Sequence, residues 1–388
     1  MNYKTSRRHH HIEQRAEKIQ RMIRIAVCLA VLLIQTGVCR AIANPAAGGD
    51  PASAQVGQEV SDTSGSSGQA QPSPTPEVRA PEQPDGSGKA GRTLIPEGRT
   101  ASSAVPGWQQ DENGWWYACD AATAYQGGWE EIDGQTYHFD GDGYRDTGWT
   151  AIAGKGCYFD EEGVYQPDAD SSKLLAFTFD DGPGRYTGRL LDLLENTGAR
   201  ATFFMLGKQV EEFGADTIPR MKELGCIIGS HSYDHTNLKA AGPEEAQRQF
   251  DRTDALIAQY NDGNGAQVIR FPYGEYTKEL SAATGRPCIF WDVDSMDWDS
   301  QNVQAIKQAV NENIEGGDIV LMHDIYETTV EACEELIPEL QAKGWQLVTI
   351  EELAAANGYE LKPGVTYFGF TQNEKDKGKV TDENREVE

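Results

Sequence analysis

Two adjacent carboxylates, Asp180 and Asp181, are the clearest sign of chemistry in this sequence. They end the apolar run 174–179 and are followed by Gly182 and Pro183. Two ionised carboxylates held side by side repel each other, which raises the pKa of one of them unless a cation is present. A metal would remove that conflict, with one Asp as a ligand and the other free to take a proton from bound water. For this tetrapeptide alone, a polar turn is the ordinary interpretation.

Four later segments contain the other residue types that such a site needs. Each lies at or just past the end of an apolar run, and in parallel α/β barrels the catalytic residues gather at that end of the strands. Taken singly, each has an ordinary structural explanation, such as a surface turn or a hydrogen-bonded histidine. The four segments are residues 231–235, 270–274, 294–298 and 321–324.

Two histidines in the first of these segments have the spacing of metal ligands. His231 and His235 are four residues apart and can face the same way on a helical turn. Together with Asp181 they would form a two-histidine, one-carboxylate set with positions left open for water and substrate. This is the donor set of a hydrolytic metal centre.

The other three segments offer groups that could serve such a centre. Arg270 could pair with a carboxylate and hold it ionised, and Asp294 ends another apolar run. His323 ends a strand-like run and is the remaining group of the set that titrates near neutrality. It is therefore the natural general acid.

Residues 172–358 alternate apolar runs with helical patterns, which predicts a parallel α/β architecture. This length is short for a complete eight-stranded barrel, which has about 250 residues. We therefore predict a shortened or distorted barrel. Thr187 is the expected N-cap of the first helix, and Gly198 lies just past its end. The predicted strands are 174–179, 201–206, 226–229, 268–271, 288–293, 319–322 and 346–348, and the predicted helices are 187–197, 210–224, 243–260, 303–314 and 329–343.

An aromatic repeat occupies residues 106–168. The dipeptide Gly-Trp recurs at 107, 128 and 148, and each copy is followed by a turn dipeptide and a short aromatic run. Asx-Gly between short aromatic runs is a strong hairpin signal. The repeat therefore predicts a small all-β module of successive hairpins that cover one another's aromatic side chains.

The two ends of the chain and its linker differ in composition from these domains. Residues 1–43 combine a basic start with a short apolar run and small residues, which predicts a secretory signal peptide, or an uncleaved signal anchor. Residues 44–105 are rich in Pro, Gly and Ser and predict a disordered linker. Residues 359–388 end in a charged stretch and predict a largely disordered tail.

Charge and cysteine content limit the classes of partner and compartment. The net charge of −27 argues against nucleic acid and other acidic polymers as partners, and it fits an exported monomer with a neutral or basic substrate. Five cysteines follow residue 43 without a CxxC pair, so the fold is not expected to depend on disulfides. A Cys119–Cys157 bridge is left open, and Cys226 and Cys288 are expected to be packed thiols.

The five catalytic segments, in this order, resemble the motifs of the polysaccharide deacetylases, the NodB-type homology domain of carbohydrate esterase family 4. The matching strings are TFDDGP, HSYDH, RFPYG, DSMDW and LMH, and the resemblance covers nearly all of residues 173–358. It implies a distorted (β/α)7-type barrel. It also implies metal-dependent removal of acetyl groups from N-acetylated sugars.

The resemblance assigns a role to each matching position. It implies that Asp180 is the catalytic base, held ionised by Arg270, and that His323 is the acid, paired with Asp294. It implies that the Tyr273 backbone N–H helps to hold the oxyanion and that Trp298 and Leu321 line the pocket for the acetyl methyl group. The implied metal ligands are Asp181, His231 and His235, and the implied metal is Zn²⁺, with Co²⁺ or Mn²⁺ as alternatives.

The aromatic module resembles the choline-binding and related cell-wall-binding repeats, in which Trp and Tyr side chains of adjacent hairpins form cages for choline or line sugar sites. Trp116 is assigned here to the position of a cage Trp, with Thr136 and Gly156 as its counterparts in the other repeats. Cys157 is assigned to the place of Tyr117 and Tyr137. The resemblance implies a wall polymer as partner, whether choline, teichoic acid or glycan. The alternative is that these aromatic side chains are only the hairpin core.

These observations together predict a secreted or surface-attached, wall-associated deacetylase of peptidoglycan N-acetylglucosamine. Chitooligosaccharides and acetylated xylan are alternative substrates for the same barrel, and xylan would mean cleavage of an O-ester. An alternative of another class is a wall-binding protein whose barrel has lost its activity.

Overall fold

The computed structural model describes residues 88–97, 99–101, 105–370 and 380–381, all of which belong to one compact unit of the chain, Glu77–Glu388. The predicted signal peptide and most of the predicted linker lie outside the described residues. Among the described helices, none has the length and apolar character needed to cross a membrane.

A parallel sheet forms the centre of the larger domain. It runs in the order β14-β15-β9-β10-β11-β12-β13-β17, with β16 added to β9, and neighbouring strands are parallel. Strand β9 pairs with three other strands, β15, β10 and β16, and all seven of its residues are buried. The strands are β9 (Leu174–Asp180), β10 (Thr202–Met205), β11 (Ile227–Ser230), β12 (Val268–Ile269), β13 (Cys288–Ile289), β14 (Val293–Asp294), β15 (Ile319–His323), β16 (Gln346–Leu347) and β17 (Thr366–Tyr367).

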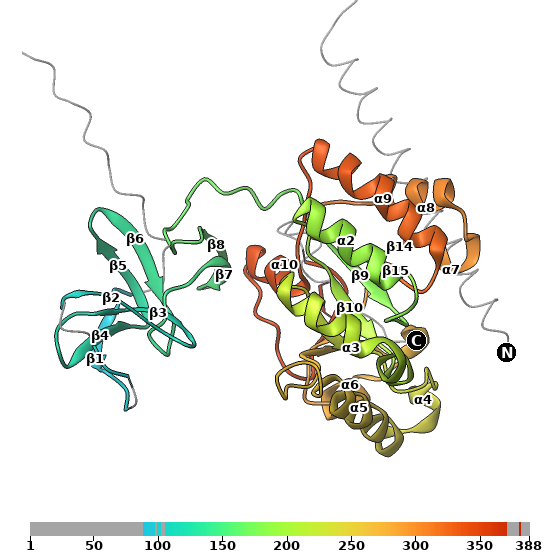
Figure 1. Ribbon diagram of the computed structural model, residues 1–388, viewed down its shortest axis with the longest axis horizontal. Coiled ribbons are helices and arrows are strands. Elements are labelled where there is room, and N and C mark those ends of the chain that lie inside the picture. The colour runs from blue at the N-terminus through green and yellow to red at the C-terminus, as the bar shows by residue number, and fades with distance from the viewer. Residues whose placement is uncertain (1–87, 98, 102–104, 371–379, 382–388) are drawn as a thin grey trace, which may run out of the picture. The chain divides into compact units, whose positions relative to one another are not determined.

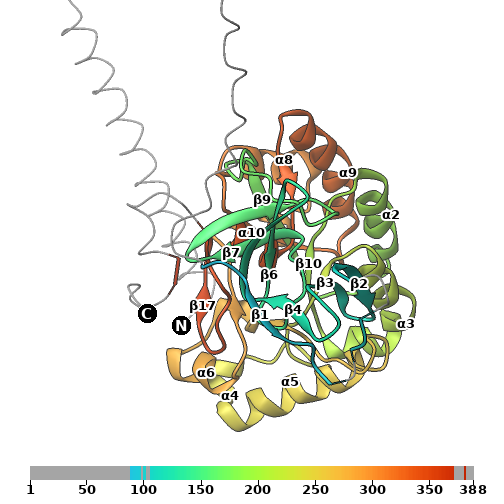
Figure 2. The ribbon, with the colours of Figure 1, turned by 90° about the vertical axis from the view of Figure 1, so that its left-hand side faces the viewer.

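Helices follow most of these strands and cover the outside of the sheet (Figures 1 and 2). Apolar side chains of β9, β10 and β15 pack against those of α2, α3 and α9 in one buried cluster. This arrangement confirms the predicted distorted α/β barrel. The helices are α2 (Thr187–Thr197), α3 (Gly207–Glu223), α4 (Leu238–Ala241), α5 (Pro243–Ile257), the short 3₁₀ helix η1 (Pro272–Gly274), α6 (Lys278–Ala283), α7 (Asp297–Ser300), α8 (Val303–Asn311), α9 (Glu327–Ala342) and α10 (Ile350–Ala356).

Helix α2 shows how the local sequence sets these elements. Leu190, Leu191 and Leu194 lie on its buried face, and Gly198 ends it in the left-handed conformation with a φ of 66°. The prediction that Thr187 is the N-cap is wrong. Tyr186 holds that position, and Thr187 is the first helical residue.

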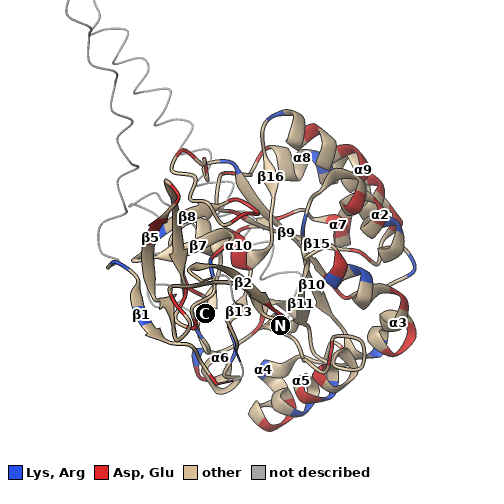
Figure 3. Cartoon of the chain, turned by 60° about the vertical axis from the view of Figure 1, so that its left-hand side comes forward, with Lys and Arg blue, Asp and Glu red and all other residues tan. Residues whose placement is uncertain are grey.

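Acidic residues are spread over the outer helices of this domain, including α3, α5 and α9 (Figure 3). Several form exposed ion pairs, such as that of Lys307 with Glu335 and Glu339. The thiols of Cys119 and Cys157 are both free, so the bridge that the sequence left open does not form. Cys226 and Cys288 are buried thiols, as expected.

The barrel domain continues beyond residue 358, so the prediction of a largely disordered tail is wrong for its first part. Strand β17 pairs with β13 through Cys288 and Ile289. The side chains of Phe370 and Val380 are buried in the core formed with β9 and α10. The apolar residues of this short segment cover the edge of the sheet beside β13. The sequence did not predict this, because the charged end of the tail indicated disorder.

The aromatic module consists of antiparallel strands, and its three hairpins confirm the repeat. They are β2 (Gly107–Asp111) with β3 (Gly114–Ala118), β5 (Gly128–Ile132) with β6 (Gln135–Phe139), and β7 (Gly148–Ile152) with β8 (Lys155–Phe159). The turn residues Asp133-Gly134 and Ala153-Gly154 all have positive φ, as a tight hairpin turn requires.

The module also includes chain that the sequence assigned to the linker. Strand β1 (Gly91–Leu94) pairs antiparallel with β4 (Thr123–Gln126), and Ala90 donates its N–H to the Trp129 carbonyl. The predicted disorder is therefore wrong for residues 88–97. All four residues of β1 are exposed, and the strand has few large apolar residues. Composition alone therefore could not identify this segment as a strand.

The hairpin register corrects the alignment of the repeats. Trp115 pairs across its hairpin with Gln110, at the position that Thr136 and Gly156 hold in the next two hairpins. Trp116 corresponds instead to Tyr137 and Cys157, and it is buried. Since side chains alternate between the two faces of a strand, a shift of one residue exchanges the faces. The exposed cage-type residue of the first hairpin is therefore Trp115, not Trp116.

The third hairpin packs closely on α10. Strands β7 and β8 contact that helix, and a side chain at Gly156 would overlap the Ala356 carbonyl. On the other side of the contact, a side chain at Gly358 would overlap the Gly154 carbonyl. The first hairpin has Trp115 at the position equivalent to Gly156. Glycine at position 156 thus allows the backbone of β8 to approach that of α10.

We expect Gly156→Ala to destabilise the protein by about 1–3 kcal/mol, since the added methyl group forces a packed backbone apart. Gly188→Ala is the matched control, because Gly188 lies in α2 with open space around it. Alanine there should leave stability unchanged or raise it by up to about 1 kcal/mol. Urea unfolding followed by tryptophan fluorescence measures both changes, and equal stability of the two variants would contradict the close packing.

Candidate metal centre and active site

The residues singled out in the sequence meet at the C-terminal ends of neighbouring parallel strands. Asp180 is the last residue of β9, and Asp181 follows it with a φ of 70°. His231 comes directly after β11, and Arg270 directly after β12. His323 is the last residue of β15 and lies in register with Asp180 on β9. The sheet therefore brings together groups that are up to 143 positions apart in the chain.

Asp181, His231 and His235 form a group that could hold a metal ion. Their ligand atoms all lie within 4.8 Å of one another. Asp181 Oδ1 is 3.7 Å from His231 Nε2 and 3.5 Å from His235 Nε2. This oxygen is buried and has no hydrogen-bond partner among the described residues, as expected of an atom reserved for a metal. The predicted ligand set is thus brought together in space.

The protonation of the two histidines also fits a metal site. His231 Nδ1 lies 2.8 Å from the Arg270 carbonyl oxygen, which can only accept, so Nδ1 donates. The lone pair of neutral His231 is then on Nε2, on the side of Asp181. Burial and the neighbouring His231 lower the pKa of His235, although Asp181 and Asp180 oppose this. Both histidines are therefore suited to bind a metal in the neutral form.

Asp180 is held by a fully buried arginine. Arg270 Nη1 donates to Asp180 Oδ1 at 2.7 Å and to Thr178 Oγ1 at 2.9 Å. The rest of the guanidinium donates to the carbonyl oxygens of Ile289, at 2.7 Å, and Phe290, at 2.9 Å. The expected ion pair is therefore present. It leaves Asp180 Oδ2 3.6 Å from His231 Nε2, at the edge of the metal-ligand group.

Asp297, not Asp294, pairs with His323, so the assignment of that partner is corrected. Asp297 Oδ1 lies 2.8 Å from His323 Nδ1, and Asp297 Oδ2 accepts the His323 backbone N–H at 2.7 Å. Asp294 Oδ1 accepts the Met296 N–H instead. Met296, with a φ of 56°, turns the chain so that Asp297 begins α7 beneath the histidine. The motif contains both acids, and their spacing could not show which one the turn directs inward.

The electrostatic surroundings of His323 favour its protonated form. Burial by itself lowers the pKa of this ring, but the charge and hydrogen bond of Asp297, together with Asp180 and Asp181, raise the pKa to about 9. Asp297 is fully buried, and its Oδ2 also accepts a hydrogen bond from Thr329 at 2.8 Å. His323 therefore carries a proton at neutral pH, as a general acid must.

The three positions assigned to substrate contact lie around this group. Tyr273, in η1, has a φ of 64°, and its ring centre is 4.3 Å from that of His235. Leu321 is buried on β15 beside Thr178, and Trp298 follows Asp297 in α7. All three residues thus lie on elements that also carry, or directly adjoin, members of the catalytic group. The oxyanion role of Tyr273 and the acetyl-lining roles of Leu321 and Trp298 stay predictions.

A second layer of residues, which sequence reasoning missed, supports the Asp181 loop. Thr187 Oγ1 accepts the Gly184 N–H at 2.7 Å and donates to Asp324 Oδ2. A side chain at Gly182 would overlap the Asp324 carboxyl group. Burial raises the pKa of Asp324 to about 7. The one sequence signal for this role of Asp324 was its position next to His323. That position does not show that the Asp324 side chain turns toward the Asp181 loop.

Comparison with known sequences agrees with this geometry. Residues 168–286 match the polysaccharide deacetylase profile. The chain is 31% identical over 193 residues to a peptidoglycan-N-acetylglucosamine deacetylase of Bacillus cereus, covering 46% of this chain and 70% of that protein. The chain belongs to the polysaccharide deacetylase family.

Two further relatives are longer proteins than this chain. Peptidoglycan-N-acetylglucosamine deacetylase PgdA of Listeria monocytogenes is 35% identical over 208 residues, covering 53% of this chain and 44% of PgdA. Peptidoglycan-N-acetylmuramic acid deacetylase PdaC of Bacillus subtilis is 36% identical over 184 residues, covering 47% of this chain and 39% of PdaC. The chain thus spans less than half the length of these two relatives. Residues 127–164 separately match the profile of a choline-binding repeat.

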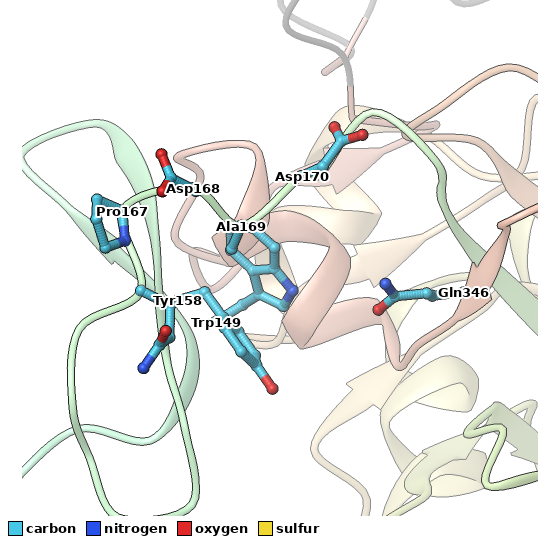
Figure 4. Close-up of a pocket in the computed structure, with 8 residues that line it drawn as sticks. Trp149, Tyr158, Pro167, Asp168, Ala169, Asp170 and Gln346 are labelled. Carbon is cyan, nitrogen blue, oxygen red and sulfur yellow. The ribbon is translucent and has the colours of Figure 1, made fainter.

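A pocket of about 410 Å³ lies apart from the catalytic group (Figure 4). The rings of Trp149 and Tyr158 form one side of it, and Gln346 of the barrel domain lies on another. None of the metal ligands lines it. The converging reactive side chains, and not this pocket, therefore mark the candidate active site.

We expect Asp180→Asn and Asp181→Asn both to abolish acetate release, but for different reasons. Loss of the Asp181 carboxylate, the predicted ligand, should weaken zinc binding at least about tenfold, while Asp180→Asn, which removes the predicted base, should leave it nearly unchanged. Isothermal titration calorimetry with zinc separates the two. Equal zinc affinity of the two variants would contradict this division of labour.

Asp297→Asn should shift the alkaline limb of the pH–activity profile to lower pH. The acid must carry its proton, so activity falls as the pH rises through the His323 pKa of about 9. Removing the adjacent negative charge lowers that pKa, by about 1–3 units for a charge at this distance. Asp294→Asn is the matched control and should leave the limb in place. A shift with Asp294→Asn, and none with Asp297→Asn, would instead identify Asp294 as the partner of His323.

Proposed function

We propose that this chain is a metal-dependent hydrolase that removes N-acetyl groups from a cell-wall polysaccharide, and that this polysaccharide is peptidoglycan, with N-acetylglucosamine as the sugar. The observation that carries the proposal is the convergence of three metal-type ligands with a carboxylate and a protonated histidine. The carboxylate is held by Arg270, and the histidine is held by Asp297. The similarity to peptidoglycan-N-acetylglucosamine deacetylases supports this substrate class.

A divalent metal held by Asp181, His231 and His235 would act as a Lewis acid on the acetyl carbonyl and lower the pKa of a bound water. The chain's own groups perform the proton transfers. Asp180, paired with Arg270, accepts a proton from the attacking water. The Tyr273 N–H donates to the carbonyl oxygen as negative charge develops there. His323, oriented by Asp297, protonates the leaving amine, and the products are acetate and a free amino sugar.

Zinc is the metal that we propose. Two imidazole nitrogens and one carboxylate oxygen, with further positions open, form the ligand set of hydrolytic zinc sites. Co²⁺ and Mn²⁺ accept similar donors and are the alternatives. The buried Asp181 oxygen, which has no hydrogen-bond partner in the described part of the chain, supports a cation at this place rather than an ordinary polar cluster.

We also propose that the protein acts outside the cell, at the wall, and that the aromatic repeats hold it there. The match of residues 127–164 to a choline-binding repeat supports a wall polymer as their partner. The signal-like composition of residues 1–43 supports export, with the signal either cleaved or retained as an anchor. A neutral substrate that becomes a cationic product suits a chain with a net charge of −27.

The proposal is tested by offering the purified full chain peptidoglycan, chitooligosaccharides and acetylxylan, each with zinc or after chelation. We expect acetate and free amine in equal amounts from peptidoglycan, and neither product after chelation. Acetate without new amine would mean ester cleavage. A protein that binds walls but takes up no metal and releases no acetate would instead be an inactive wall-binding protein.

A further inference from the structure

Two sites between successive hairpins are structurally equivalent. Backbone hydrogen bonds show which residue occupies each place. The Arg145 N–H donates to the Trp115 carbonyl at 2.8 Å. One repeat later, the Tyr165 N–H donates in the same way to the Thr136 carbonyl at 2.8 Å. Trp115 and Thr136 hold the same register position in their hairpins. Arg145 and Tyr165 are therefore equivalent residues, each placed against the aromatic side chains of the preceding hairpin.

The first of these places contains the guanidinium group of Arg145. Its central carbon lies 5.7 Å from the centre of the Trp108 ring and 5.5 Å from that of Trp115. Both distances fall within the range of a cation–π contact. The cation thus faces two tryptophans of the first hairpin.

The same side chain is fixed at its other end by the third repeat. Arg145 Nη2 donates to the Glu161 carbonyl at 2.8 Å, and Nη1 donates to the Glu162 carbonyl. A methyl group at Gly163 would lie only 2.8 Å from Arg145 Cδ, so the stem fills the available space. The third repeat therefore holds the guanidinium of Arg145 through both of its terminal nitrogens.

The second place is filled by an aromatic ring. The Tyr165 ring centre is 5.0 Å from that of Trp129, at 71°, and 5.6 Å from that of Phe159. Thr136 stands here in place of Trp115, so one wall of a possible cage is missing. Within residues 105–170, both inter-repeat places are thus occupied by the chain itself.

We infer that Arg145 is a built-in occupant of the aromatic site between the first repeats, and that it closes this site to quaternary ammonium ions such as choline. The repeats would then recognise a wall polymer through features other than choline. This inference rests on the proposed wall-binding role of the module, but it does not depend on the deacetylase activity.

The physical basis is competition between a tethered and a free cation. A side chain attached beside its site has an effective concentration that a free ligand must exceed in order to replace it. Displacing Arg145 would also break its hydrogen bonds to two carbonyl groups. A choline methyl group cannot replace these bonds, because it lacks an N–H donor. The site therefore favours its own guanidinium.

The test is a titration of the full chain with choline chloride, followed by tryptophan fluorescence. We expect no saturable response from the unchanged protein. Arg145→Ala should open the site and increase the affinity for choline at least about tenfold, as expected for a cation between two aromatic rings. Arg145→Gln, which keeps a hydrogen-bond donor but removes the charge, should show a smaller gain and guards against misfolding of the alanine variant.

Two controls make the test specific. Arg248→Ala removes an exposed arginine of the barrel domain, which pairs with Glu245 on α5, and should not create choline binding. The double variant Arg145→Ala/Trp115→Ala should lose the gain. Thermal unfolding confirms that each variant is folded.

Saturable choline binding by the unchanged protein, or no gain in folded Arg145→Ala, would overturn the inference. Sedimentation with walls that carry or lack choline separates this outcome from a failure of the wall-binding proposal. We expect equal binding to both kinds of wall. Binding only to choline-bearing walls would overturn the inference, whereas binding to neither would refute the wall-binding role and leave the titration with free choline as the decisive measurement.

Discussion

The buried ion pair of Arg270 and Asp180 is the interaction on which the site depends. A buried charge is tolerated only when it is paired and its remaining hydrogen-bonding groups are satisfied. Arg270 meets this condition through the carbonyl groups of Ile289, at the end of β13, and of Phe290, just after it, and through Thr178 on β9. Its own carbonyl group receives the His231 ring N–H. One residue therefore fixes the orientation of the carboxylate and of a metal ligand, and it joins the ends of several strands in a single geometry.

Backbone conformations that most residues avoid are concentrated around the same group. Asp181, His235 and Tyr273 all have φ between 64° and 70°, in the left-handed region. Such a conformation costs about 1–3 kcal/mol for each non-glycine residue and persists only where the surroundings impose it. Here the packed strand ends and the layer formed by Thr187 and Asp324 provide that constraint. The core of the barrel thus stabilises local geometry that the loops would not adopt by themselves.

The sequence predicted the parts of this structure that depend on short-range pattern. Apolar runs located the strands, and the ligand spacing of His231 and His235 survived because both residues lie in one loop beside β11. Predictions failed where the outcome depended on which way a turn directs the chain. Asp294 and Asp297 are three residues apart, and only the conformation of Met296 selects the second. Trp115 and Trp116 are adjacent, so their roles were set by a register that composition does not contain. Strand β1 and the segment around Phe370 were missed because they are ordered by partners far away in the chain.

The register between β15 and β9 has a consequence for the cycle of the proposed reaction. His323 lies opposite Asp180 on the neighbouring strand, and adjacent strands are about 4.8 Å apart. One turnover leaves Asp180 with an extra proton and His323 without one, so the net charge of the pair is unchanged although its distribution is reversed. Before the next turnover a proton must move from the carboxyl group to the imidazole. Because the two groups share one row of the sheet, the proton has only to cross from one strand to its neighbour, and the return to the starting state would need no path through the protein interior.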